Sequence, residues 1–184
     1  MALAAAWADP VVVRRTAVPP VRDVAAATRW IAGEAERRAQ GLALDLVVAS
    51  AAGGGRDVLG EVGLARFDRP GAGGRPAAGG GGRFAGADGR AEIGFWTAPA
   101  ARGRGLAAVA VRLLAAWALT PPAGTVPPGA GGGGGGGLGL WRVWARTAPG
   151  DDRAGGVLRG AGFTRRGEAA GSVVWIRDAA RVRA

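Results

Sequence analysis

Residues 102–107, Arg-Gly-Arg-Gly-Leu-Ala, combine residue types that could bind a phosphate group. Gly103 and Gly105 let an anion approach the backbone, and Arg102 and Arg104 add positive charge. From Leu106 onward, apolar residues recur at three- and four-residue spacing, which predicts a helix over 103–119. The first N–H groups of a helix lack intrahelical partners and point beyond its end. The pattern therefore predicts a turn that holds a pyrophosphate.

Two common phosphate motifs do not fit this stretch. The chain contains no lysine, which excludes the G-x-x-x-x-G-K-[ST] loop. A dinucleotide-binding G-x-G-x-x-G would need a glycine where Ala108 stands, and an acidic residue about 20 positions later. The chain also lacks cysteine, histidine and tyrosine, so thiol nucleophiles are excluded and no metal site is expected.

The elements that must position this turn follow from hydrophobic periodicity. A helix is predicted over 21–40, with Val21, Val24, Thr28, Ile31 and Ala35 on one face. Strands are predicted over 42–50, 58–67, 91–97, 140–147, 164–168 and 172–178, with a short helix over 151–161 and a turn at 53–55. Residues 68–90 and 120–139 form low-complexity loops rich in Gly and Pro. This order predicts an α+β fold with helices on a mostly antiparallel sheet.

The hexapeptide at 102–107 resembles the R/Q-x-x-G-x-G/A signature of the GNAT superfamily of N-acetyltransferases. Residues 91–105 resemble its RimJ/RimL branch, which acetylates N-terminal amines of ribosomal proteins and other amines. The strand, helix and Gly162-Phe163 order after residue 140, and the strand at 58–64, also match the family. The resemblance spans about residues 7–178 and implies a single domain over 1–184 that lacks the family's first strand. The strand at 42–50 would then have an unpaired edge.

This resemblance implies acetyl-CoA as the acetyl donor and a protein N-terminus or a small molecule as the amine acceptor. The strands at 91–97 and 140–147 would splay apart to admit acetyl-CoA. Backbone N–H groups of residues 102–107 would hold its pyrophosphate, and the strand edge at Phe95, Trp96 and Thr97 would pair with the pantetheine arm and polarise the thioester. Asp151 stands where many members carry a cofactor-binding Asn.

Glu92 is the predicted general base, since the family often places a glutamate at the start of this strand. Burial near apolar neighbours would raise its pKa toward a useful value. The alternative is an ordinary strand glutamate that faces water or pairs with an arginine. Glu61 on the neighbouring strand is a weaker candidate.

Departures from the family pattern leave two other functions open. Ala154 and Leu158 replace a serine and the tyrosine that acts as general acid, so no acid is identifiable. An acyl-CoA-binding protein without turnover would fit these changes. A basic nucleic-acid-binding module is the third hypothesis, because the net charge is +10. Scattered arginines make it the weakest.

Further expectations concern location and aromatic residues. No signal peptide or membrane span is predicted, so the expected location is cytoplasmic. Dimers are frequent in the RimJ/RimL branch, so the resemblance allows a homodimer. The tryptophans of the predicted strands are expected to supply core mass rather than to line an acceptor pocket. They are Trp96, Trp141, Trp144 and Trp175.

Overall fold

A computed structural model describes residues 2–15, 21–51, 57–65, 89–123 and 136–180. The predicted turn at 53–55, and most of the two predicted loops, lie outside these residues. The elements, in chain order, are α1 (Ala2–Trp7), α2 (Pro10–Arg15), α3 (Val24–Ala32), α4 (Glu34–Ala39), β1 (Ala43–Ala49), β2 (Val58–Ala65), β3 (Arg90–Thr97), the 3-10 turn η2 (Pro99–Ala101), α5 (Leu106–Leu119), β4 (Arg142–Thr147), α6 (Asp152–Gly160), β5 (Thr164–Ala169) and β6 (Ser172–Asp178).

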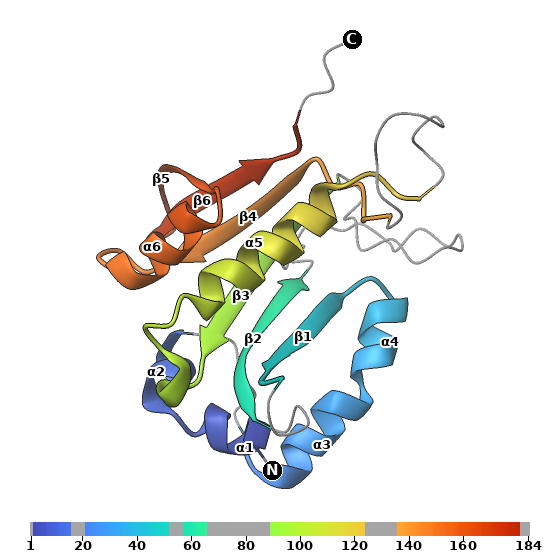
Figure 1. Cartoon of the computed structure of the whole chain (residues 1–184), viewed down its shortest axis with the longest axis vertical. Coiled ribbons are helices and arrows are strands. Elements are labelled where there is room, and N and C mark those ends of the chain that lie inside the picture. Colours follow the sequence, from blue (N-terminus) through green and yellow to red (C-terminus); the bar gives the residue numbers. More distant parts are fainter. Residues whose placement is uncertain (1, 16–20, 52–56, 66–88, 124–135, 181–184) are drawn as a thin grey trace.

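The strands form one sheet in the order β1-β2-β3-β4-β6-β5. Its pairs are antiparallel except β3 with β4, which run parallel. This confirms the predicted α+β class with a mostly antiparallel sheet. β1 is an edge strand of the described sheet and lies beside α4 (Figure 1). Among the described residues, no helix is both long and apolar enough to cross a membrane.

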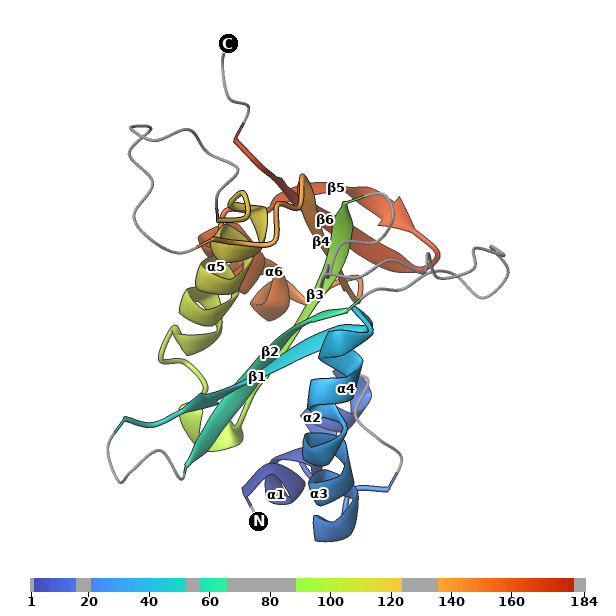
Figure 2. The same cartoon turned by 90° about the vertical axis from the view of Figure 1, so that its right-hand side faces the viewer.

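Two helical layers cover the two faces of the sheet. Figure 2 shows α5 and α6 on one side of the strands and α1 to α4 on the other. Strand side chains alternate between these faces. The larger core packs alternate residues of the strands against α5 and α6, with Val111, Ala115 and Leu158 fully buried. α5 therefore rests on the sheet along a stripe that also contains Leu114 and Ala118.

A second core joins the N-terminal helices to β3. Trp7 is 1% exposed and meets Trp30 edge-on, with their ring centroids 5.6 Å apart. Trp96 of β3 completes this cluster, together with the fully buried Ala27. Aromatic rings in this arrangement gain more than their buried area alone gives. The cluster fixes α1 and α3 on the sheet face opposite α5.

The predicted helix over 21–40 is wrong as a single element. Asp23 caps α3 by accepting from the N–H of Ala26 at 2.7 Å, and Gly33 separates α3 from α4. The predicted buried face is also wrong, because Val24 and Ile31 are about half exposed. The small residues Ala26 and Ala27 face the core instead, because the bulky Trp7 and Trp30 already fill the space there.

Some predicted core residues lie at the surface. Trp96 and Trp175 are buried as expected, whereas Trp141 is 46% exposed just before β4, beside the guanidinium groups of Arg90 and Arg142. On α5, three members of the apolar periodicity, Val109, Leu113 and Trp117, face outward. The predicted helix and strand are both present, but packing against the sheet determines which face of the helix is covered.

Candidate active site

β3 has an open edge on the side of β4. The parallel pairing covers only residues 90–92 of β3 and 142–144 of β4. Beyond these, β4 follows β6, with which it pairs along its whole length, and leaves β3 (Figure 1). N–H groups along a strand face alternate edges. The N–H of Ala98 donates to the carbonyl of Leu59 on β2, so the N–H groups of Phe95 and Thr97 face the opposite, open edge.

The turn after β3 presents backbone donors and open space. Gly103 and Gly105 both have φ +74°, a conformation that favours glycine, and a Cβ at either one would meet no atom within 4 Å. The N–H groups of residues 103–105 donate to no described residue. α5 begins directly after them at Leu106. This arrangement of free N–H groups, a helix start and glycine-lined space suits a phosphate.

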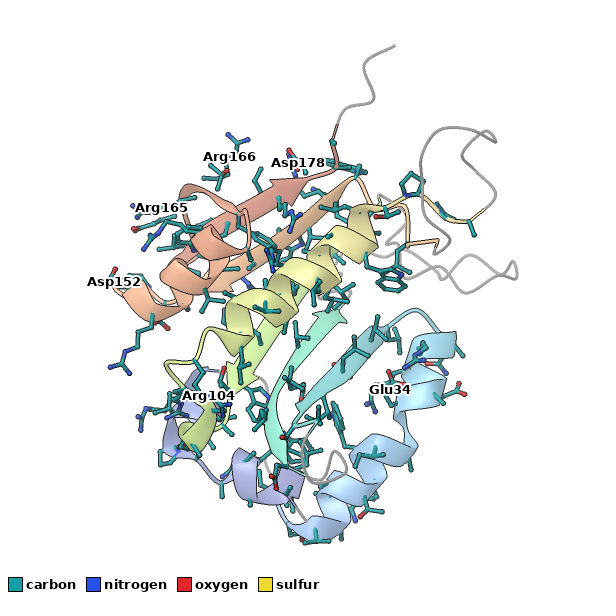
Figure 3. All side chains as sticks on the ribbon, in the orientation of Figure 1. Glu34, Arg104, Asp152, Arg165, Arg166 and Asp178 are labelled. Atoms are coloured by element: carbon teal, nitrogen blue, oxygen red, sulfur yellow. The ribbon has the colours of Figure 1, made fainter. Side chains whose placement is uncertain are left out.

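The two arginines of the turn have different environments. Arg102 donates from Nη2 to Asp9 Oδ1 at 2.7 Å and from Nε to the carbonyl of Thr97 at 3.2 Å. Its hydrogen bond to Asp9 holds the pKa of that carboxyl below its usual value. Arg104 is exposed at the turn before α5 (Figure 3) and pairs with no described residue. Of the two side chains, Arg104 is therefore the one available to an anion.

A shallow hollow, partly open to solvent, lies between β1, β2, β3 and the start of α5. Five of the predicted cofactor-binding residues line it: Phe95, Trp96, Thr97, Leu106 and Ala107. The sequence prediction missed the other lining residues except for Glu61, its weaker base candidate. They are Val48, Leu59, Gly60 and Ala110. The other predicted site residues lie outside this lining: Glu92, Arg102, Gly103, Arg104, Gly105 and Asp151.

Glu92 sits where β3 and β4 still pair. Arg146 binds it through two hydrogen bonds, from Nε at 3.0 Å and from Nη2 at 3.1 Å. Burial raises the pKa of Glu92 even though Arg146 opposes the rise. The predicted base is thus a half-buried carboxylate held by an arginine, which was the alternative considered for it, and its catalytic role stays a prediction.

Glu61 occupies a drier site on β2. Its Oε2 accepts from Nε1 of Trp96 at 3.2 Å, and Asp45 lies on the adjacent strand. Burial raises the pKa of Glu61 to about 7, and the charge of Asp45 adds to the rise, while Trp96 and Arg37 oppose it. A carboxyl group with this pKa can exchange protons near neutral pH. The sequence signal for this site is that Glu61 is the single carboxylate among the small and apolar residues of β2.

Asp151 has a structural role at the end of β4. Its carboxylate accepts from the N–H of Ala154 at 3.2 Å and so caps α6. Nearby, Thr147 Oγ1 accepts from Nε1 of the buried Trp175 at 3.1 Å. The role of Asp151 as a cofactor ligand stays a prediction. Within the described ranges, no group of three His, Cys, Asp or Glu side chains lies close enough to hold a metal ion.

The family described as the acetyltransferase (GNAT) domain matches residues 1–164 of this chain. This chain belongs to the GNAT acetyltransferase family. The described sheet, with helices on both faces, is therefore the fold of a GNAT domain. No curated protein matches the chain.

Solved structures share the GNAT fold at low sequence identity. The ribosomal-protein-S5-alanine acetyltransferase of Vibrio fischeri has a TM-score of 0.65 and 16% identity, covering 97% of this chain and 86% of its own. RimJ of Mycobacterium smegmatis, solved with CoA-disulfide, has a TM-score of 0.62 and 17% identity, covering 96% and 77%. The microcin C7 self-immunity acetyltransferase MccE, solved with acetyl-CoA and AMP, has a TM-score of 0.60 and 15% identity, covering 91% and 79%.

Proposed function

We propose that this protein transfers an acetyl group from acetyl-CoA to a primary amine. The observation that carries the proposal is the open edge of β3, which is followed by a glycine turn whose N–H groups have no described partner and which leads directly into α5. An extended arm can pair with a strand edge as a further strand would. An anionic group at its end would then meet the N–H groups before α5. Acetyl-CoA supplies the activated acetyl group.

The chain's own residues divide this task. Gly103, Arg104 and Gly105 would bind the pyrophosphate, with the first turn of α5 behind them. Backbone groups of Phe95 and Thr97 would hold the pantetheine arm and polarise the thioester carbonyl. Arg102 would act on the turn indirectly, because its guanidinium is bound to Asp9 and to the backbone.

The acceptor is an amine of either kind found among the structural neighbours. The Vibrio fischeri protein is named for a ribosomal protein, whereas another neighbour is described as a phosphinothricin N-acetyltransferase. Membership of the RimJ/RimL branch would favour a protein N-terminus. A cytoplasmic location and a homodimer belong to the same proposal.

A second candidate is an acyl-CoA-binding protein without turnover. The observation that favours it is Leu158, which stands where the family resemblance places a tyrosine acid and is fully buried in the larger core. It leaves no hydroxyl there to protonate a departing thiolate. A thiol is a good leaving group, however, so turnover does not depend on such an acid.

Calorimetric titration of the full chain with acetyl-CoA tests the proposal, with ADP as the matched control. We expect micromolar binding that requires the pantetheine arm, followed by release of free thiol when an amine is added. A folded chain that does not bind acetyl-CoA would contradict the proposal. Binding without thiol release across a panel of amines and peptides would favour the second candidate.

A further inference from the structure

Gly94 of β3 leaves one position in the middle of the sheet bare on one face, whereas the space over its neighbour Gly63 is filled by the side chain of Asp45. Gly63 of β2 stands opposite Gly94 of β3, and Asp45 of β1 stands opposite Gly63. Val62 and Ile93 point into the core under α5, so the alternation of strand side chains assigns this row to the other face. A Cβ at Gly94 would meet no atom within 4 Å. The space over Gly94 is therefore open, and it lies beside the open edge of β3.

Two carboxylates flank this open space. Glu92 lies two residues before Gly94 on the same strand, about 6–7 Å along it. Glu61 lies diagonally across from Gly94 on β2, at a spacing of about 7–8 Å for such neighbours. Both side chains share the face of Gly94 by alternation. Position alone does not show whether Glu61 or Glu92 acts as the base.

The hydrogen-bond partners of Glu61 and Glu92 distinguish the two carboxylates. Arg146 occupies both oxygens of Glu92. Glu61 accepts one hydrogen bond at Oε2, and its Oε1 has no partner among the described residues. A base needs a free lone pair within reach of the substrate.

We propose that Glu61, acting over Gly94, is the group that accepts the proton of the acceptor amine, and that the Glu92–Arg146 pair is a fixed wall beside it. This assignment rests on the proposed acetyl transfer. Asp45 is a positioning residue, since its negative charge favours the protonated form of Glu61 without touching the amine. Gly94 leaves room for the amine between Glu61 and the strand edge.

The step balances without a further reactant. The acceptor arrives as an ammonium ion and gives one proton to Glu61. The free amine nitrogen forms a bond to the thioester carbonyl carbon while the carbon–sulfur bond breaks. The departing sulfur takes the second proton from nitrogen, so the products are the amide and the CoA thiol. Glu61 then releases its proton to solvent.

The electrostatic setting agrees with this role. The charged and polar groups that face Glu61 are Asp45 from β1, Trp96 from β3 and Arg37 from α4. Burial and the combined effect of these groups leave the pKa of Glu61 at about 7. At neutral pH this value balances the strength of the base against the fraction of it that is deprotonated. Burial also raises the pKa of Asp45, although Arg37 opposes the rise.

The test compares Glu61→Gln with Glu92→Gln in the full chain. Carbon-13 NMR of the glutamate carboxyl groups should reveal one resonance with a midpoint near pH 7 that E61Q removes and E92Q keeps. A midpoint below about 5.5 for that resonance, near the ordinary glutamate value, would overturn the assignment whatever the activity. Asp45→Asn should shift the midpoint to lower pH.

Kinetics with n-butylamine and an alanine tripeptide amide provide the second readout. E61Q should lower kcat by about 100-fold or more, as for the loss of a general base, with acetyl-CoA affinity unchanged. E92Q should lower kcat by a smaller factor than E61Q does. The reverse order would overturn the assignment and leave the acetyl transfer standing. Failure of the wild-type chain to bind acetyl-CoA would instead contradict the proposed function itself.

Discussion

The two edges of β3 differ along most of their length. Toward β2, six consecutive pairs hold residues 92–97, whereas toward β4 the pairing stops after residue 92. The strand itself is regular on both sides, so its own propensity does not explain the opening. β4 pairs with β6 through its other edge along its whole length and turns away from β3 together with it. The open edge thus lies where two parts of one sheet diverge, and the pairing of β3 with β2 keeps that edge in place.

The largest expected effect separates binding at the open edge from folding. Gly105→Glu places a carboxylate where an anion is expected and forces a side chain into a left-handed conformation. Acetyl-CoA affinity should fall by more than ~1000-fold, about 4 kcal/mol. Calorimetric titration measures it.

Gly171→Glu is the matched control, because Gly171 has φ +71° and equally open space in the turn between β5 and β6. It should bind acetyl-CoA as the wild type does. Equal losses in the two variants would mean that backbone strain, and not the anion site, causes the effect.

A second expected effect concerns the proton bound by Glu61 on β2, the strand that pairs with β3. The folded chain keeps Glu61 protonated up to about pH 7, whereas the unfolded chain ionises near pH 4.5. The folded state therefore binds the extra proton between these values, and its free energy of unfolding falls as pH rises through them, by roughly 3 kcal/mol. Urea unfolding at pH 5 and pH 8 measures this change.

Glu61→Gln should flatten that pH dependence, because glutamine does not titrate. Glu168→Gln on the exposed strand β5 is the control and should leave the wild-type slope unchanged. Asp45 and Glu92 also have raised pKa values and contribute slope of the same sign in every variant. An unaltered slope in E61Q would show that Glu61 ionises normally in the folded chain.

A third pair of variants contrasts crowded and open glycines of the same two strands. A Cβ at Gly60 would lie 2.4 Å from the carbonyl oxygen of Trp96, so Gly60→Ala must displace the β2–β3 pairing. Its cost should be about 1–3 kcal/mol of unfolding free energy. Gly94→Ala meets nothing and should change stability by less than about 1 kcal/mol. Similar losses in both would contradict the open face at Gly94.

The smallest effect lies at the far end of β4. Asp151→Asn keeps a good helix cap and removes a negative charge near the site expected for an anion. Acetyl-CoA affinity should rise by about twofold to threefold, with stability within ~0.5 kcal/mol. Asp151→Ala should instead cost about 1 kcal/mol of stability through the lost cap. Equal affinities for wild type and D151N would place Asp151 away from the ligand.

The sequence predicted the elements better than their orientation. The strands, α5 and the glycine turn follow from local periodicity and turn chemistry, and the structure contains them. The break at Gly33 and the inward turn of Ala26 and Ala27 depend on Trp7 and Trp30, which approach only in the folded chain. Local periodicity contains no information on that contact, so the wrong helix face was chosen.

The candidate site shows the same division. The glycine turn at 103–105 and the start of α5 form one continuous segment, so local residue types predicted their conformation, and their binding of an anion stays a prediction. The setting of Glu61 depends on Asp45, Trp96 and Arg37, which three other elements bring together through strand register. The pairing of Glu92 with Arg146 likewise requires the parallel β3–β4 contact. A single sequence does not specify such registers, so the two glutamates could not be ranked from it.

The bond between Arg102 and Asp9 connects the glycine turn to the first helices, because Asp9 also accepts from the N–H groups of Val11 and Val12 at the start of α2. Any ligand that orders the turn must then also favour the docked position of α1 and α2, and by thermodynamic reciprocity the docked helices must strengthen the ligand. Limited proteolysis within residues 2–15 would therefore report occupancy of a site to which those residues contribute no direct contact. The Arg102–Asp9 ion pair thus couples the N-terminal segment to the turn.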